Sequence, residues 1–245
     1  MFTQNLITKL KAADSVVFFT GAGISAESGV PTFRGNDGLW KKFRPEELAN
    51  FDAFVKNPVL VWEWYKYRKK LISNIKPNPG HYAIAEMEKH YKSFAVVTQN
   101  IDNLHRRAGS KNVFELHGNI ERNYCIDCRK WYSNEEIMSS KDVPKCACGG
   151  LIRPDVVWFG ELLPEDQWNN SVKFAEKADV FFAVGTSAVV YPAASLPLIA
   201  KRAGAYVVEI NIERTELSNN VDELLLGKSG EILPKIVDAC FNEDN

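Results

Sequence analysis

The chain has 245 residues, of which 45% are hydrophobic and 25% charged, which suits one globular unit or a large domain with a small insert. Its 30 Lys and Arg residues balance 31 Asp and Glu residues, and the net charge of -1 argues against a dedicated nucleic-acid-binding protein. It has neither an apolar run near the ~20 residues that cross a bilayer nor the opening pattern of a signal peptide. We therefore expect a cytoplasmic protein with no nucleic-acid or membrane partner and, without long terminal extensions, a monomer.

Short apolar runs alternate with helical patterns along most of the chain. The runs are near-continuous, as is typical of parallel strands covered on both faces, and they lie at 15–20, 94–98, 113–116, 179–184 and 205–210. Helical patterns lie at 4–13, 58–74, 79–91, 102–108, 164–177, 193–203 and 230–241. This alternation predicts an α/β fold with a Rossmann-like, doubly wound parallel sheet.

Two stretches interrupt the alternation. Residues 35–78 are aromatic and charged without a clear strand, and residues 119–153 carry four of the five cysteines. We predict that these two segments form a smaller module, a helical segment plus a zinc ribbon. The main domain then consists of residues 1–34, 79–118 and 154–245.

The cysteine spacing predicts a metal site. Cys125-x-x-Cys128 and Cys146-x-Cys148 can supply four thiolates to one tetrahedral zinc ion, and a shell of four cysteines leaves no position for water, so the ion is structural. A ~35-residue insert buries little apolar surface, and metal binding supplies the missing folding energy. Unliganded or redox cysteines are the alternative. Cys240, on a helical pattern, is expected to be a core residue.

A glycine-rich turn follows the strand at 15–20. Gly21-Ala22-Gly23 leads into a helix start, and glycines at such a turn let the backbone approach a phosphate while the helix N-terminus offers free N–H groups. A plain turn that binds nothing has the same three residues. The longer string through Arg34 is more specific than the glycines alone.

Polar residues follow three other strands, where the ligand crevice of an open α/β sheet lies. Thr98 to His105 reads TQNIDNLH, and its plainer interpretation is a hydrogen-bonded turn with Asp102 as a helix cap. His117 follows the strand at 113–116 and has a side chain suited to general-base work, although a single histidine is more often structural. We assign His105 a structural role, and we expect His81 and His90 at the surface.

Gly185-Thr186-Ser187 and Asn211-Ile212-Glu213 follow the strands at 179–184 and 205–210. Their small, hydroxyl and acidic side chains can contact phosphate or ribose. A dehydrogenase of the usual kind places its acidic residue about 20 positions after the glycine loop, near residue 45, where no strand precedes it. The acidic residue that follows a strand here is Glu213, far from that position, and this difference disfavours a hydride-transfer enzyme.

These strings, in this order from residue 15 to about 235, resemble those of the sirtuins, the NAD-dependent protein-lysine deacylases. The resemblance implies that lysine deacylation is coupled to NAD cleavage, giving nicotinamide and 2′-O-acyl-ADP-ribose. It implies that His117 is the catalytic base and that Asn100 and Asp102 position the ribose and a water. It also implies these cofactor contacts: Gly21, Ala22, Gly23, Ile24, Ser25, Thr32, Phe33, Arg34, Trp40, Gln99, Asn100, Ile101, Asp102, Gly185, Thr186, Ser187, Asn211, Glu213 and Ser229.

The sirtuin resemblance extends to the zinc site and to the substrate. The family has four zinc cysteines, usually with Cys-x-x-Cys as its second pair, where this chain has Cys146-x-Cys148. Arg153 to Glu161 reads RPDVVWFGE and resembles the segment that pairs with an acyl-lysine peptide. Val157, Phe159, Gly160 and Glu161 are therefore expected substrate contacts. The other interpretation of this run is a buried strand that returns to the main domain.

A Tyr-x-x-Arg pair marks sirtuins that accept acidic acyl groups, and this chain has Tyr65 and Arg68 three positions apart on a helical pattern. Arginine can give a carboxylate a two-pronged contact and tyrosine a hydroxyl, while Ala49 matches a small residue that widens the pocket. We expect desuccinylation and demalonylation together with deacetylation. The alternative is that Arg68 belongs to a solvated basic run and Tyr65 to the core, which leaves a plain deacetylase.

Two rival functions remain at this point. A mono-ADP-ribosyltransferase uses the same NAD site with a different acceptor. A nucleotide-sensing or nucleic-acid-binding module with a zinc ribbon is disfavoured by the near-neutral charge and by the lack of a basic patch beside the cysteines.

Overall fold

Six parallel strands form the main sheet of the computed structural model, which describes residues 2–32 and 45–242. Their order is β3-β2-β1-β7-β8-β9. The strands are β1 (Ser15–Thr20), β2 (Ser93–Thr98), β3 (Val113–Glu115), β7 (Val180–Val184), β8 (Tyr206–Asn211) and β9 (Glu223–Leu226). The predicted α/β class and parallel sheet are confirmed; β9 was not predicted.

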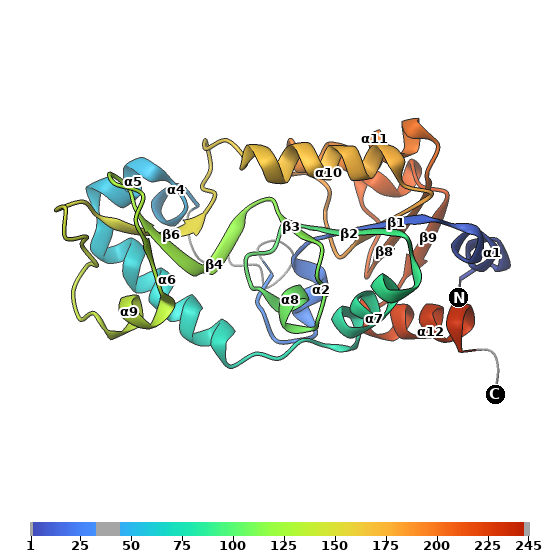
Figure 1. The fold of residues 1–245 in the computed structure, drawn as a ribbon, viewed down its shortest axis with the longest axis horizontal. Helices are drawn as coiled ribbons and strands as arrows, with labels where there is room; N and C mark the ends of the chain where they lie inside the picture. The colour runs from blue at the N-terminus through green and yellow to red at the C-terminus, as the bar shows by residue number, and fades with distance from the viewer. Residues whose placement is uncertain (1, 33–44, 243–245) are drawn as a thin grey trace.

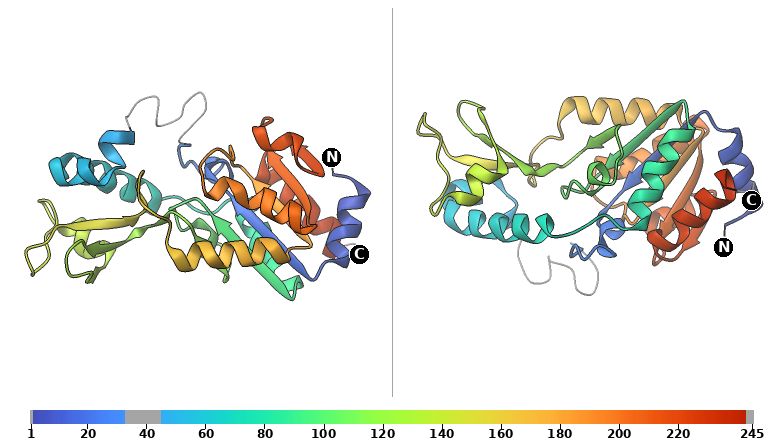
Figure 2. Two further views of the ribbon diagram at one scale, coloured as in Figure 1. Left: turned by 90° about the horizontal axis from the view of Figure 1, so that it is seen from above. Right: turned by 60° about the horizontal axis from the view of Figure 1, so that its bottom comes forward.

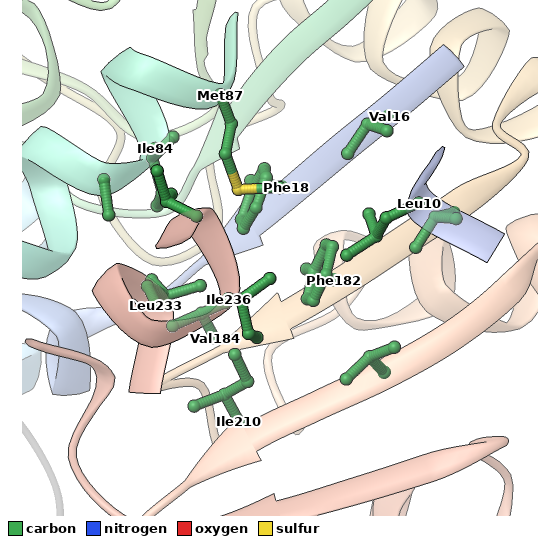
Figure 3. Close-up of a cluster of buried hydrophobic side chains, with 14 of the residues drawn as sticks. Leu10, Val16, Phe18, Ile84, Met87, Phe182, Val184, Ile210, Leu233 and Ile236 are labelled. Carbon is green, nitrogen blue, oxygen red and sulfur yellow. The ribbon is translucent and has the colours of Figure 1, made fainter. Parts of the chain in front are cut away.

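Helices cover both faces of this sheet, as Figure 1 shows. One face packs on α1 (Gln4–Ala12), α7 (Pro79–Met87) and α12 (Ser229–Phe241), and the other on α10 (Glu165–Lys177) and α11 (Leu196–Ala203). Side chains alternate between the two cores: Phe18 and Phe182 stack on the first face, 4.5 Å between ring centroids, whereas Phe19 and Phe181 lie in the second. Figure 3 shows the first core, with Leu233 and Ile236 of α12 facing the strands.

A second, three-stranded sheet has the order β5-β4-β6 and is antiparallel. It consists of β4 (Gly118–Cys125), β5 (Trp131–Tyr132) and β6 (Ile152–Val156), and it packs on α4 (Pro45–Leu48), α5 (Phe51–Lys56), α6 (Pro58–Ser73) and α9 (Asn134–Ser139) through a core of its own. Figure 2 shows this group at the end of the molecule away from both termini. The division of the chain into domains at the predicted boundaries stays a prediction.

Short elements complete the described part of the chain. They are α2 (Ala22–Ala26), α8 (Leu104–Arg107) and the 3-10 turns Glu88–His90, Ala193–Ser195 and Glu216–Asn219. The helix predicted at 102–108 begins two residues later, because the Asp102 carboxylate accepts the Leu104 amide at 3.0 Å and Asn103 adopts a left-handed φ of 62°. Within the described ranges, no helix is long and apolar enough to cross a bilayer.

The strand order reverses direction between β1 and β7. The chain passes from β1 to β2 and β3 on one side, then returns to place β7 on the other side of β1. In open α/β sheets the ligand crevice lies outside the carboxyl ends of the strands at this kind of switch point. Gly21 follows β1 and Gly185 follows β7, so both glycine turns lie at this edge.

Candidate active site

The two glycine turns pack directly against each other. The Gly21 amide donates to Val184 O at 3.0 Å, and the Gly23 amide donates to Gly185 O at 2.8 Å. A Cβ on Gly23 would lie 2.7 Å from Gly185 Cα, and one on Gly185, whose φ is +58°, would lie 2.4 Å from Ile24 N. These glycines are therefore needed for the contact between two turns, in addition to any approach of a phosphate. The helix that follows, α2, has five residues.

A buried polar network lies beside the glycine turns. The Ser25 hydroxyl donates to Asp102 Oδ2 at 2.7 Å, and the Asn100 amide nitrogen donates to Gly21 O at 2.9 Å and to Ser25 Oγ at 3.2 Å. Asp102 is 4% exposed. Burial raises the pKa of Asp102, and its hydrogen bonds from Leu104 and Ser25 oppose that rise. The network brings together four of the predicted site residues: Gly21, Ser25, Asn100 and Asp102.

His81 extends this network, and the prediction that it lies at the surface is wrong. It is fully buried at the start of α7, where its Nδ1 accepts the Asn78 amide at 3.3 Å. Its Nε2 is then the protonated nitrogen and donates to Ser25 Oγ, 3.4 Å away. Burial lowers the pKa of His81 to about 4, so the ring is neutral at neutral pH. The helical period alone could not show which face of α7 points inward; His90 is exposed as predicted.

His105 has the structural role predicted for it. Its ring is buried, lies 4.9 Å from that of His81, and places Nε2 2.9 Å from the Thr20 hydroxyl, which itself bonds Thr98 across β1 and β2. Burial lowers its pKa well below 6.5. The two histidines thus connect the carboxyl ends of both strands to α7.

His117 is held in one tautomer by the backbone. Its Nδ1 lies 3.0 Å from Gln99 O, and because a carbonyl oxygen can only accept, Nδ1 carries the proton. In the neutral ring Nε2 therefore keeps a lone pair. Burial lowers the pKa of His117, which favours the neutral form that a general base requires. The backbone oxygen of His117 also accepts the Val157 amide at 3.0 Å, which joins the backbone of this residue to the predicted substrate segment.

The remaining strand-end residues meet through hydrogen bonds. Gln99 Nε2 donates to Thr186 Oγ1 at 2.9 Å, and Asn211 Nδ2 donates to Thr186 O at 3.0 Å. Ser187 and Glu213 are exposed. Ser229 is buried at the start of α12, and its hydroxyl donates to Glu27 Oε1 at 3.2 Å. Three strand ends and the start of α12 thus present polar groups along one edge of the sheet.

Several predicted cofactor contacts need separate comment. Ile24 and Ile101 have buried side chains that belong to the hydrophobic cores, so any contact from them is through the backbone. Ala22 and Thr32 are partly exposed. Phe33, Arg34 and Trp40 lie outside the described residues.

The predicted substrate segment leaves its strand. β6 ends at Val156, and residues 157–161 form a turn in which Gly160 has a φ of +88°. The Phe159 amide donates to Ala49 O at 2.9 Å, so this turn lies against the predicted acyl-pocket residue. Phe159 and Gly160 are exposed, and Val157 and Glu161 are partly buried.

Tyr65 and Arg68 share the buried face of α6 and are 2% and 5% exposed. Arg68 is therefore not part of a solvated basic run. The Tyr65 hydroxyl accepts a hydrogen bond from the Trp158 indole nitrogen, and the Arg68 guanidinium lies 5.7 Å from the centre of the Trp64 ring. Burial raises the pKa of Tyr65 and lowers the pKa of Arg68. The charges of Tyr65 and Asp102 oppose the lowering of the Arg68 pKa.

The four cysteine sulfurs lie within 4.8 Å of one another. Cys125 and Cys148 place their sulfurs 3.5 Å apart, as do Cys128 and Cys146. A tetrahedral zinc with ~2.3 Å bonds to sulfur requires separations of roughly this size, so both members of the Cys-x-Cys pair fit a single zinc ion. The Tyr132 hydroxyl donates to Cys146 Sγ at 3.0 Å and orients that sulfur.

Comparison with known proteins gives consistent matches over the whole chain. The Sir2 family model matches residues 21–192. An NAD-dependent protein deacylase of Pyrococcus furiosus is 54% identical over 239 residues, which cover 95% of this chain and 96% of that protein. A Sir2 homologue solved as an NAD complex has a TM-score of 0.93 and 46% identity, over 99% of this chain and 95% of that chain. A Sir2 variant solved with a deacetylated p53 peptide and 3′-O-acetyl-ADP-ribose has a TM-score of 0.88 and 38% identity, over 97% and 98%.

Proposed function

The chain belongs to the Sir2 family, and we propose on that premise that it is an NAD-dependent protein-lysine deacylase with one structural zinc ion. The observation that carries the proposal is the tautomer of His117. Its proton lies on Nδ1, toward Gln99 O, so Nε2 is free to accept a proton at the carboxyl edge of the sheet. The match to deacylases over nearly the full length of the chain supports the same activity.

When bound, NAD supplies an electrophilic ribose carbon for the acyl oxygen and an acceptor for the acyl group, so that the products are nicotinamide, free lysine and 2′-O-acyl-ADP-ribose. In our proposal His117 Nε2 takes the proton of a ribose hydroxyl. The lowered pKa keeps this nitrogen unprotonated at neutral pH. Asn100 and Asp102 orient the ribose and a water, and the buried bonds to Ser25 and Gly21 restrict both side chains to one arrangement.

Other proposed contacts follow from position. Gln99, Gly185, Thr186, Asn211 and Ser229 lie along the carboxyl edge where the cofactor would extend. We also propose contacts from Arg34 and Trp40, and shielding of the reaction centre by Phe33. Segment 157–161 would pair with the backbone of the acyl-lysine peptide, next to His117.

We further propose that the acyl pocket accepts carboxylated groups, succinyl and malonyl, as well as acetyl. Tyr65 and Arg68 lie on one face of α6, and a hydrogen bond from Phe159 joins Ala49 to the proposed peptide segment. Arginine can give the carboxylate at the end of such an acyl chain a two-pronged contact, and the Tyr65 hydroxyl on the same face can add a hydrogen bond.

The test is mass spectrometry of one peptide that carries either succinyl-lysine or acetyl-lysine, with and without NAD. NAD-dependent loss of both groups supports the deacylase and the wide pocket. The Arg68→Met variant should then lose desuccinylation far more than deacetylation. Loss of acetyl alone leaves a plain deacetylase, and label that moves from radioactive NAD to protein without loss of either group indicates an ADP-ribosyltransferase instead.

A further inference from the structure

A buried arginine fixes the turn that we assign to peptide binding. Arg153 is 3% exposed on β6, and its Nη1 and Nη2 donate to Glu161 Oε1 and Oε2 at 2.5 and 2.8 Å. Nη2 also donates to Val156 O at 2.7 Å. The guanidinium therefore joins the end of the strand to the far side of the turn, with the planar two-pronged geometry that only arginine provides.

Trp158 lies inside the loop that this ion pair closes. The Arg153 guanidinium lies 3.5 Å from the centre of the indole ring, and the Trp158 amide donates to Glu161 Oε2 at 2.8 Å. Glu161 thus receives three hydrogen bonds, two from Arg153 and one from the backbone of the turn. We call Arg153, Trp158 and Glu161 the clamp.

The buried clamp holds a turn whose tip is exposed to solvent. Phe159 and Gly160, which it encloses, are exposed, whereas Arg153 and Trp158 are buried. An exposed turn ordinarily samples several backbone conformations, and each must be lost when a peptide pairs with it. An ion pair that holds both ends of the turn reduces this entropy before the peptide arrives.

We propose that Arg153 is a positioning residue for the acyl-lysine peptide: through Glu161 and Trp158 it preorganises segment 157–161 for backbone pairing, and it sets peptide affinity without contacting the cofactor. This inference rests on the peptide site of the proposed function. It predicts an effect on the KM of the peptide that is separate from kcat and from the KM of NAD.

The decisive variant is Arg153→Lys, which keeps the charge and loses the two-pronged bond and the flat stacking surface. We expect the KM and the Kd of the peptide to rise about tenfold, as for loss of a charge-assisted hydrogen bond. The kcat and the KM of NAD should stay within about twofold of the wild-type values. The matched control is Arg122→Met, which removes the 2.7 Å ion pair with Asp155 between the same two strands, β4 and β6, together with a 2.8 Å ion pair with Glu115.

A cavity of about 210 Å³ beside the clamp allows a rescue experiment. It is lined by Phe51 and Tyr124 together with Arg153 and Glu161. In Arg153→Ala, millimolar methylguanidine should enter the vacated space and restore part of the peptide affinity, whereas urea at the same concentration should not. A loss of affinity caused by general misfolding would not respond to either compound in this way.

Several outcomes would overturn the proposal. These are a peptide Kd within twofold of wild type in Arg153→Lys, an equal rise in the KM of NAD, or the same effect in Arg122→Met. If Arg153 variants fail to fold, Glu161→Gln keeps the shape of the side chain and weakens the ion pair. It should raise the peptide Kd and lower the melting temperature, because the buried Arg153 loses its counter-charge, and the Kd is measured at a temperature where circular dichroism shows folded protein. An unchanged Kd there counts against the clamp. Peptide Kd is measured by fluorescence anisotropy, which needs no turnover. A wild type that binds peptide but does not deacylate it therefore contradicts the proposed function, while the Kd values still decide on the clamp; no peptide binding contradicts both.

Discussion

The indole nitrogen of Trp158 donates a 2.8 Å hydrogen bond to the hydroxyl of Tyr65. Because the Tyr65 oxygen accepts this proton, its own proton is directed elsewhere. Burial raises the pKa of Tyr65, so the hydroxyl remains protonated at neutral pH and acts as a donor. The bond therefore joins the proposed peptide segment to the proposed acyl pocket and leaves Tyr65 with a proton to donate to an acyl carboxylate.

This relationship predicts that Trp158→Phe lowers kcat/KM for a succinyl peptide about tenfold, the effect of one lost hydrogen bond in a buried site. The acetyl peptide has no carboxylate, and Phe keeps a ring against Arg153 and the amide that donates to Glu161, so its kcat/KM should fall less than that of the succinyl peptide. Tyr65→Phe should show the same selectivity, and the double variant should be no worse than Tyr65→Phe alone. Steady-state kinetics on both peptides decide this. Additive losses would mean that Trp158 does not act through the Tyr65 hydroxyl.

His117→Ala should abolish turnover while the fold and the zinc content stay those of the wild type. The residue lies outside the cysteine cluster, and its ring contacts the backbone through one bond to Gln99 O. In the wild type, kcat/KM should decline on the acid side only below the ordinary histidine pKa of 6.5, because burial lowers the pKa of His117. Appreciable deacylation by the alanine variant would contradict the role of His117 as the base.

The sequence predicted the main sheet well and the second sheet poorly. Strands such as β1 and β7 are covered on both faces, and continuous apolar runs show this directly. β4 instead contains Glu121 and Arg122, so no local apolar pattern indicates a strand. Arg122 pairs with Asp155, 33 residues away, and Glu121 accepts a hydrogen bond from Asn103, 18 residues away. β9 has four residues and begins with Glu223, which bonds the hydroxyl of Thr3.

The sequence likewise predicted some residues of the candidate site and missed others. Their position at strand ends, together with the sirtuin resemblance, predicted His117, Asn100 and Asp102, because parallel strands bring their carboxyl ends to one edge. The sequence did not indicate His81 or Arg153. His81 joins the network only because α7 turns that face inward, and Arg153 acts through a carboxylate eight residues away across a turn.

His81 should make the protein less stable in acid. Its pKa is about 4 in the folded chain against an ordinary 6.5, so the unfolded state binds more protons between these values. The stabilisation is complete above pH 6.5 and is lost as the pH falls toward 4. By linkage the loss attributable to His81 is up to about 3 kcal/mol. Urea unfolding from pH 7.5 to 4.5 should show a smaller acid loss in His81→Gln than in the wild type; equal losses would mean that His81 does not titrate in this way.

Zinc removal should unfold the second sheet before the first. The four sulfurs join the end of β4 and the loop that follows it to the loop before β6, and two residues of β5 pair beside them. Chelation should release one zinc per chain and lower the melting temperature, and Cys148→Ser should do the same. Cys240→Ser is the control, since this thiol lies in the core of the main sheet and should leave zinc content unchanged. Full zinc retention by Cys148→Ser would exclude Cys148 as a ligand.

Gly23→Ala distinguishes two functions for the glycine turn. If the glycine only leaves room for a phosphate, alanine should weaken NAD binding and leave stability intact. The contact with Gly185 Cα, 2.7 Å from the added Cβ, predicts instead a loss of about 2 kcal/mol in the free energy of unfolding, because backbone on both sides must move.

Gly29→Ala is the matched control. Gly29 has a φ of +91° and open space around the new methyl group, so the substitution costs only the backbone strain, about 1 kcal/mol. Urea unfolding and NAD titration of the two variants measure both effects. A Gly23→Ala protein with wild-type stability and weakened NAD binding would show that the contact between the two turns is not what requires glycine at this position.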